Sequence, residues 1–155
     1  ADEAVSALDV SIQSQIINLF AELRRELGLS MIFISHDLSV VRHVSDRIAV
    51  MYFGKFVETA PAEDLFRAPM HPYTRALLDS TPRIDMRYEP GARDLPAIGG
   101  RPPNPAQRPD GCQFHPRCAE AGEDCRALLP RMTASGPGHA VSCLRRGSRV
   151  EENAA

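Results

Sequence analysis

One stretch of the chain, residues 11–27, most restricts how it can fold. Its apolar residues recur at spacings of three and four, which places them on one face of an α-helix. These residues are Ile12, Ile16, Leu19, Phe20, Leu23 and Leu27. Asp9 or Ser11 is suited to cap the start of this helix, and Gly28 is suited to end it. The apolar run Met31–Ser35 is too short for a helix and predicts a buried strand.

Helix and strand signals continue to about residue 82. Asp37 is placed to cap a second, short helix. Residues 47–51 and 56–59 predict the two strands of a hairpin, and Pro61 and Pro72 each suit the first turn of a short helix. Helical and strand segments that alternate in this way are typical of an α/β fold. We therefore expect residues 1–82 to belong to an α/β domain.

The composition changes after residue 82. Residues 90–109 contain six prolines and three glycines, so residues 83–110 are expected to be an extended connector. Residues 111–146 hold all four cysteines and few large apolar side chains, which predicts a small, loop-dominated extension held by something other than a hydrophobic core. Residues 147–155 are expected to be a disordered tail.

The overall charge excludes some classes of partner. The formal net charge is −2, so no strong attraction to nucleic acid or anionic lipid is expected.

No apolar run approaches the roughly 18 residues of a membrane-spanning helix. The chain opens on Ala1 followed by two acidic residues, which is unlike a signal peptide. We expect it to begin partway through a longer protein.

Lys55 is the only lysine, and this limits phosphate chemistry. A phosphate-binding loop of the form G-x-x-x-x-G-K-[ST] needs a lysine followed by serine or threonine. Phe56 follows Lys55, and Ala49 stands where the first glycine would be. The 155 residues therefore contain no such loop.

Three acidic residues and one histidine form the main candidate site: Asp2, Glu3, Asp9 and His36. His36 follows the predicted strand, and ligands of open α/β sheets bind at the carboxyl ends of strands. Such a set suits metal-assisted phosphoryl transfer, in which one carboxylate holds Mg²⁺, another orients water and the imidazole senses a phosphate. Taken singly, an Asp-Glu pair is more often a solvated turn, and a histidine after a strand more often a capping or packing residue.

The order of these motifs resembles the end of an ABC transporter ATPase domain, a P-loop NTPase. The resemblance rests on Asp2-Glu3-x-x-Ser6-Ala7-Leu8-Asp9, the long helix, and Ser35-His36-Asp37. It implies that Asp2 is associated with Mg²⁺, that Glu3 is the general base, and that residues 6–9 form the D-loop at the interface of two ATPase domains. It also implies that His36 contacts the γ-phosphate of ATP. Ala4 replaces the family's usual proline, which is expected to loosen this turn.

A second motif, His71-Pro72-Tyr73-Thr74-Arg75-Ala76-Leu77-Leu78, resembles the oligopeptide/dipeptide/nickel branch of the family. Physically it predicts an amphipathic helix opened by proline, and we treat it as a mark of the branch rather than as a site. The resemblance implies an energy-coupling subunit for peptide import, cytoplasmic and bound to the inner face of the membrane. Its implied partners are a second ATPase subunit, transmembrane permeases and an extracytoplasmic peptide-binding protein.

The four cysteines, Cys112, Cys118, Cys125 and Cys143, allow three disulfide pairings. An ATPase site indicates the cytoplasm, where disulfides are uncommon, so a metal site is the alternative. A [4Fe–4S] cluster and Zn²⁺ both remain open; the wide spacing favours iron–sulfur, because zinc sites usually have close cysteine pairs. The segment also resembles the branch's C-terminal extension, which implies an iron–sulfur cluster. His115 and His139 are alternative ligands or neighbours, and four unligated thiols are a further alternative.

Taken alone, these residues are expected to be inactive, because they lack the phosphate-binding loop. Two other interpretations remain: a non-enzymatic metal-binding or regulatory module based on residues 112–143, and a truncation product without independent function.

Overall fold

A computed structural model describes residues 1–6, 8–81, 98–100, 103–104 and 106–147. Most of the predicted connector, and residues 148–155 of the predicted tail, lie outside these described residues. The chain divides into two compact units, Ala1–Asp46 and Arg47–Ala155.

The first unit contains helices α1 (Val10–Leu27) and α2 (Leu38–Val44). Gly28 ends α1 in the left-handed conformation at φ 62°, as its sequence position predicts. Asp37 caps α2 by accepting hydrogen bonds from the backbone N–H groups of Ser39 and Val40. Val5, Ile17 and Val40 form a small core, against which Ile16, Phe33 and Val44 pack.

The prediction of a buried strand at Met31–Ser35 is wrong for the described residues. Ile34 forms a single parallel bridge with Asp2, and Ile32 is 81% exposed. A strand needs a neighbour along its length to complete its ladder. Among the described residues, this segment has only the few residues around Asp2 beside it, so it remains an apolar edge.

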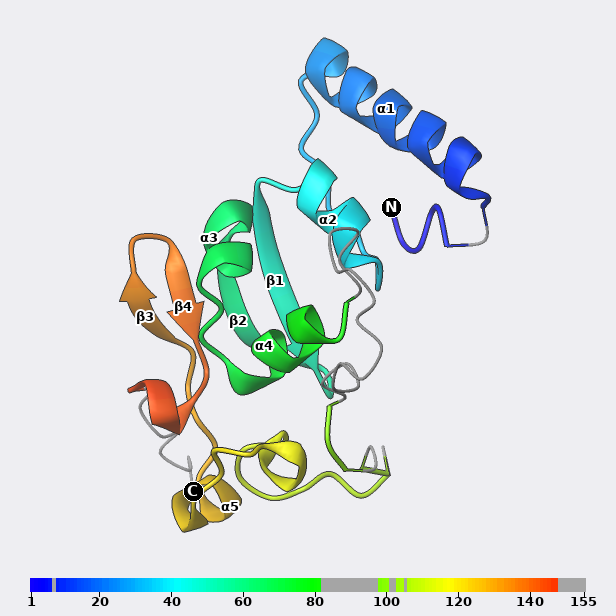
Figure 1. Cartoon of the computed structure of the whole chain (residues 1–155). Coiled ribbons are helices and arrows are strands. Elements are labelled where there is room, and N and C mark those ends of the chain that lie inside the picture. Colours follow the sequence, from blue (N-terminus) through cyan, green and yellow to red (C-terminus); the bar gives the residue numbers. More distant parts are fainter. Residues whose placement is uncertain (7, 82–97, 101–102, 105, 148–155) are drawn as a thin grey trace, which may run out of the picture. The chain divides into compact units, whose positions relative to one another are not determined.

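The second unit is built on an antiparallel sheet in the order β1-β2-β4-β3 (Figure 1). Its strands are β1 (Arg47–Tyr52), β2 (Lys55–Pro61), β3 (Thr133–Gly136) and β4 (His139–Val141). Phe53 and Gly54 join β1 to β2 at positive φ, which is the geometry of a tight hairpin turn. The predicted hairpin is confirmed, with alternate residues of β1 buried.

The second unit also contains several short helices. They are α3 (Ala62–Arg67), α4 (Pro72–Asp79) and α5 (Glu123–Ala127), with the 3₁₀ turns η1 (His115–Arg117) and η2 (Leu144–Arg146). Of these, α3 contacts β1 and β2. Pro61 and Pro72 precede and open α3 and α4 as predicted. Leu65 of α3 is fully buried. The result is a mixed α/β structure with a small antiparallel sheet.

The cysteine-rich segment is part of the second unit rather than set apart from it. Strand β4 pairs with β2, matching Glu58 with Val141 and Thr59 with Ala140. The boundary between the two compact units falls between Asp46 and Arg47. Strand pairing between distant parts of the sequence joins residues on both sides of the predicted connector into one unit. No helix within the described ranges has the length and apolarity needed to cross a membrane.

Candidate functional site

Glu3 and His36 lie together in the first unit. The Nδ1 atom of His36 is 3.2 Å from Oε1 of Glu3, and both side chains are more than half exposed. A backbone hydrogen bond links the two segments: the Glu3 N–H donates to the carbonyl oxygen of Ile34 at 2.9 Å. Glu3 has a φ of 45°, which is uncommon for a residue other than glycine. A carboxylate and an imidazole thus face one solvent-accessible position.

Asp2 and Asp9 flank this pair in the sequence. Asp2 forms the bridge to Ile34, and Asp9 occupies the N-cap position of α1 without a side-chain capping bond. Both residues are exposed. Among the described residues, neither carboxylate is hydrogen-bonded to Glu3 or His36, so the structure joins two of the four predicted residues by direct contact.

The loop that carries His36 is tied to both helices of its unit. The Asp37 N–H donates to Ser35 Oγ at 3.0 Å, and the Gln13 amide of α1 donates to Asp37 Oδ2 at 3.4 Å. Asp37 also caps α2. His36 therefore stands between anchored neighbours, which restricts its position relative to Glu3.

The four cysteines gather in one region of the second unit, and none of them forms a disulfide. Burial raises the pKa of Cys112 to about 11; a backbone hydrogen bond from Phe114 opposes this, and the other three cysteines add to it. Burial likewise raises the pKa of Cys118 and of Cys143. The thiols are therefore close enough to influence one another, and these three stay protonated at neutral pH when no cation is bound.

The side-chain positions do not fit a ready-made metal centre. Within the described ranges, no three histidine, cysteine, aspartate or glutamate side chains converge as metal ligands do. His115 Nδ1 lies 2.9 Å from the Cys112 carbonyl oxygen, and His139 pairs elsewhere. Metal binding would require the thiols to lose protons and to converge further.

A buried carboxylate, Glu58 of β2, lies at the centre of a polar network that the sequence did not predict. Its two oxygens accept hydrogen bonds from the backbone N–H groups of Met70 at 2.7 Å and His71 at 2.9 Å. His139 Nε2 of β4 is 2.7 Å from Oε1. Glu58 is fully buried, so these contacts replace its water.

His71 connects this carboxylate to the second sequence motif. Its Nδ1 accepts a hydrogen bond from the Tyr73 N–H at 3.0 Å and thereby caps α4. In the neutral ring the proton therefore sits on Nε2. Burial lowers the pKa of His71 to about 4, with Glu58 acting in the opposite direction. His71 is a neutral capping residue at physiological pH.

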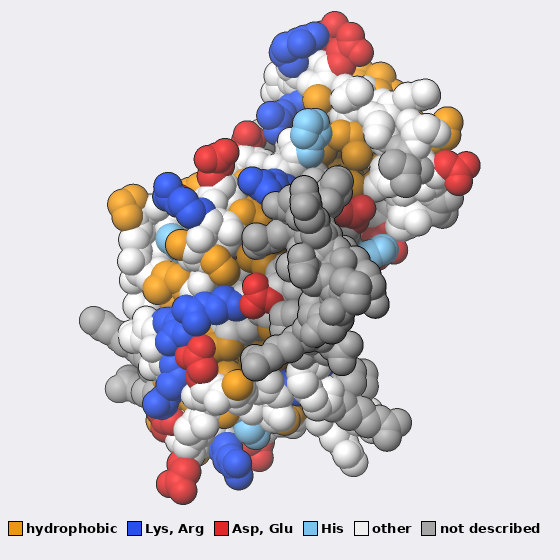
Figure 2. Space-filling model, in the orientation of Figure 1, with side chains coloured by type: hydrophobic (Ala, Val, Ile, Leu, Met, Phe, Trp, Pro, Cys, Tyr) orange, Lys and Arg blue, Asp and Glu red, His pale blue; other side chains and the backbone are white. Residues whose placement is uncertain are grey.

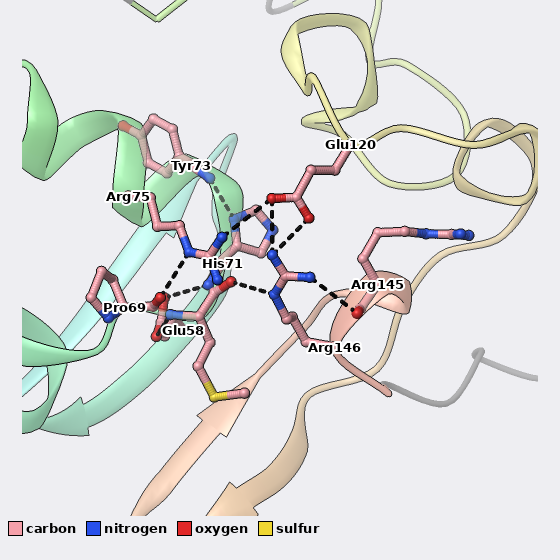
Figure 3. A network of polar contacts seen from close by, with 9 residues as sticks. Glu58, Pro69, His71, Tyr73, Arg75, Glu120, Arg145 and Arg146 are labelled. Carbon is pink, nitrogen blue, oxygen red and sulfur yellow. Dashed lines mark hydrogen bonds and ion pairs between the residues drawn. The ribbon is translucent and has the colours of Figure 1, made fainter. Parts of the chain in front are cut away.

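Glu120 and Arg146 connect the cysteine-rich segment to α4 and to the residues just before it (Figure 3). Glu120 pairs with Arg146 at 2.6 Å and with Arg75 of α4 at 3.3 Å. Arg146 also donates from Nε to the Met70 carbonyl at 3.1 Å. These ion pairs and hydrogen bonds connect segments that are distant in the sequence. The charged groups of Arg75, Glu120 and Arg146 are therefore paired with one another.

Comparison with known proteins gives a consistent picture. Residues 57–125 match the family model described as "Oligopeptide/dipeptide transporter, C-terminal region". The chain is 49% identical over 143 residues to the oligopeptide transport ATP-binding protein AppF of Bacillus subtilis, covering 92% of this chain and 43% of that protein. It is 46% identical over 144 residues to the dipeptide transport ATP-binding protein DppF of Haemophilus influenzae, covering 93% and 43% respectively.

The chain is therefore similar to the ATP-binding proteins of oligopeptide and dipeptide ABC transporters, and the family model that it matches describes their C-terminal region. The chain spans about two fifths of the length of the curated relatives it matches. The resemblance read from the sequence motifs is confirmed at this level.

Proposed function

We propose that this chain supplies part of the ATP-hydrolysing site of a subunit that powers peptide import across a membrane. The observation that carries the proposal is the 3.2 Å contact between Glu3 and His36 in a chain of this family. In the proposed reaction, Glu3 orients and deprotonates the attacking water, while His36 binds the γ-phosphate. Asp2 would hold Mg²⁺, and Asp9 would lie in the loop facing a second ATPase subunit.

The proposed site needs residues that this sequence does not contain. Without a phosphate-binding loop, Glu3 and His36 have no bound nucleotide on which to act, so the chain alone should not turn over ATP. The first unit also exposes apolar side chains: Leu27 is 63%, Ile34 54% and Ile32 81% exposed. Figure 2 shows hydrophobic side chains at the surface of the part of the molecule that contains α1. Exposed apolar side chains beside an unpaired edge support packing against a further part of the sheet.

The partners and location follow from the same proposal. A subunit of this kind would act with a second ATPase subunit, with transmembrane permeases and, through them, with an extracytoplasmic peptide-binding protein. It would sit on the cytoplasmic face of the membrane. The names of the relatives, an oligopeptide and a dipeptide transport ATP-binding protein, support peptides as the cargo.

The test is ATP turnover after the missing part is supplied. The chain is fused to the preceding part of a relative, such as the Bacillus subtilis oligopeptide transport protein, and hydrolysis is measured with Mg²⁺. Glu3→Gln should lower turnover by about 10²-fold or more, since it removes a general base. Glu22→Gln, an exposed carboxylate on α1, is the matched control and should leave turnover unchanged.

Unchanged turnover in Glu3→Gln would remove Glu3 from the proposed role. If no fusion hydrolyses ATP although it binds nucleotide, the interpretation as a truncation product without activity gains support instead.

The cysteines support a second candidate function, a metal-binding module that holds a [4Fe–4S] cluster or Zn²⁺. Its basis is that the backbone N–H of Cys112 donates to the carbonyl oxygen of Cys125 at 2.9 Å, which brings two of the four cysteines side by side. The chain purified without oxygen should then contain iron with sulfide, or zinc, and Cys125→Ser should lose it. Absence of all three elements from the purified chain would eliminate this candidate.

A further inference from the structure

Three buried polar groups in the second unit lack a protein partner among the described residues: the hydroxyl of Thr74 and two that belong to residues lining one cavity. These two are the hydroxyl of Tyr52, at the end of β1, and the side-chain oxygen of Gln113. Tyr52 is only 7% exposed, so bulk water does not solvate its hydroxyl freely. A buried polar group without a hydrogen bond costs about 1–3 kcal/mol, and proteins rarely leave one unsatisfied.

Both residues line the same cavity. It has a volume of about 20 Å³, and its wall also includes His71, Cys112 and Ser142. A cavity of this measure needs roughly 10–15 Å³ to hold one water molecule. The space therefore suits one water and is too small for an organic ligand.

The other side chains that line the cavity determine which further hydrogen bonds a water molecule there could form. Phe114 is 2% exposed and its ring centroid lies 5.3 Å from that of Tyr52, so this side of the cavity is apolar. The Ser142 hydroxyl already donates to the Pro130 carbonyl at 2.7 Å and retains an accepting lone pair. The His71 Nδ1 is occupied by the Tyr73 N–H. Among the residues that line the cavity, Tyr52 and Gln113 each hold a buried polar atom without a protein partner within the described ranges.

We propose that this cavity is a binding site for one ordered water molecule, which accepts a hydrogen bond from the Tyr52 hydroxyl and donates one to the Gln113 side-chain oxygen. The water joins the end of β1 to the start of the cysteine-rich segment, because Gln113 directly follows Cys112. It thereby contributes to holding that segment against the sheet, separately from the Glu58 network.

A crystal structure of the chain at high resolution tests this directly. The expected result is one electron-density peak within hydrogen-bond distance of Tyr52 Oη and Gln113 Oε1. Tyr52→Phe and Gln113→Met each remove one partner and should lower or abolish the occupancy of this peak. Thr74→Val is the matched control: Thr74 Oγ1 is also buried without a partner among the described residues, but Thr74 does not line the cavity, so the water should remain.

Nuclear magnetic resonance supplies a second measurement if a variant does not fold. The unmodified chain in solution should show cross-peaks between a long-lived water and protons of residues around the cavity. A dry cavity, a direct hydrogen bond between Tyr52 and Gln113, or a peak that keeps full occupancy in both variants would each overturn the proposal.

Discussion

The two compact units differ in how they satisfy their apolar and polar groups. Residues 1–46 have a small core of Val5, Ile17 and Val40 and leave several large apolar side chains exposed. Residues 47–147 bury Leu65, Val141 and the charged Glu58 completely, and contacts between distant segments hold them. Contacts within the second unit bury these side chains. The proposed catalytic residues lie in the first unit, which leaves large apolar side chains exposed. The proposed catalytic residues and the most completely buried side chains therefore lie in different units.

Removing the buried carboxylate should have the largest effect on this difference. Glu58→Ala leaves two backbone N–H groups and His139 without their acceptor, so the free energy of unfolding should fall by about 4 kcal/mol. Urea unfolding followed by circular dichroism measures it. Glu63→Ala, an exposed residue of α3, should change the midpoint little. Equal effects of the two substitutions would show that the network does not stabilise the second unit.

The contrast in packing predicts unequal costs for apolar substitutions. Leu65→Ala opens a cavity at a fully buried position and should cost about 3 kcal/mol. Ile32→Ser alters a side chain that is 81% exposed and should not lower the stability of the chain measurably. Thermal melting of both variants checks this. A large loss in Ile32→Ser would mean that the apolar edge is already covered in solution.

Acid should weaken the second unit through His71. Its pKa is about 4 in the folded chain and 6.5 in the unfolded chain, so the unfolded state takes up a proton first as the pH falls. Stability should therefore be unaffected by His71 above pH 6.5 and decline toward pH 4, by about 3 kcal/mol in total. His71→Asn keeps a side chain suited to cap α4 but does not titrate, so the difference between its profile and that of the unmodified chain isolates this effect. Parallel profiles would contradict the assignment.

The smallest predicted effect concerns the first unit. Asp37→Ala removes the cap of α2 and should destabilise that unit by about 1 kcal/mol. Hydrogen exchange of the α2 amides reports the change locally. Asp46→Ala, which removes only an ion pair between partly exposed side chains, is the control. If exchange in the second unit accelerates equally, the two units are not energetically separate.

Local patterns in the sequence were enough to predict much of the structure. Apolar spacing and the cap at Gly28 identified α1, and Pro72 located α4, because these signals act within a few residues. Strands β3 and β4 were missed, since Thr133–Gly136 and His139–Val141 are short and carry no clear alternation. The failure at Met31–Ser35 has another origin: its apolar content suggests burial, but burial depends on neighbours.

The candidate site shows the same division. Family motifs named Glu3 and His36, which the structure then brings into contact. The pair of Glu58 and His139 could not be predicted in this way, because 81 residues separate them and a lone glutamate in a strand has no motif. The one signal in the sequence is a charged residue, Glu58, on the buried face of a predicted strand. This signal indicates a buried polar contact but does not identify His139 as the partner.

The pairing of Glu58 with His139 has a consequence for the order of events during synthesis. His139 lies 81 positions after Glu58, so at about 5–20 residues per second a ribosome needs roughly 4–16 s to extend the chain from one to the other. For that interval the β1–β2 hairpin carries a carboxylate that cannot yet be buried with its imidazole partner. The second unit therefore cannot bury this carboxylate with its partner until β4 has been synthesised. Chains terminated before residue 139 should remain targets for proteolysis.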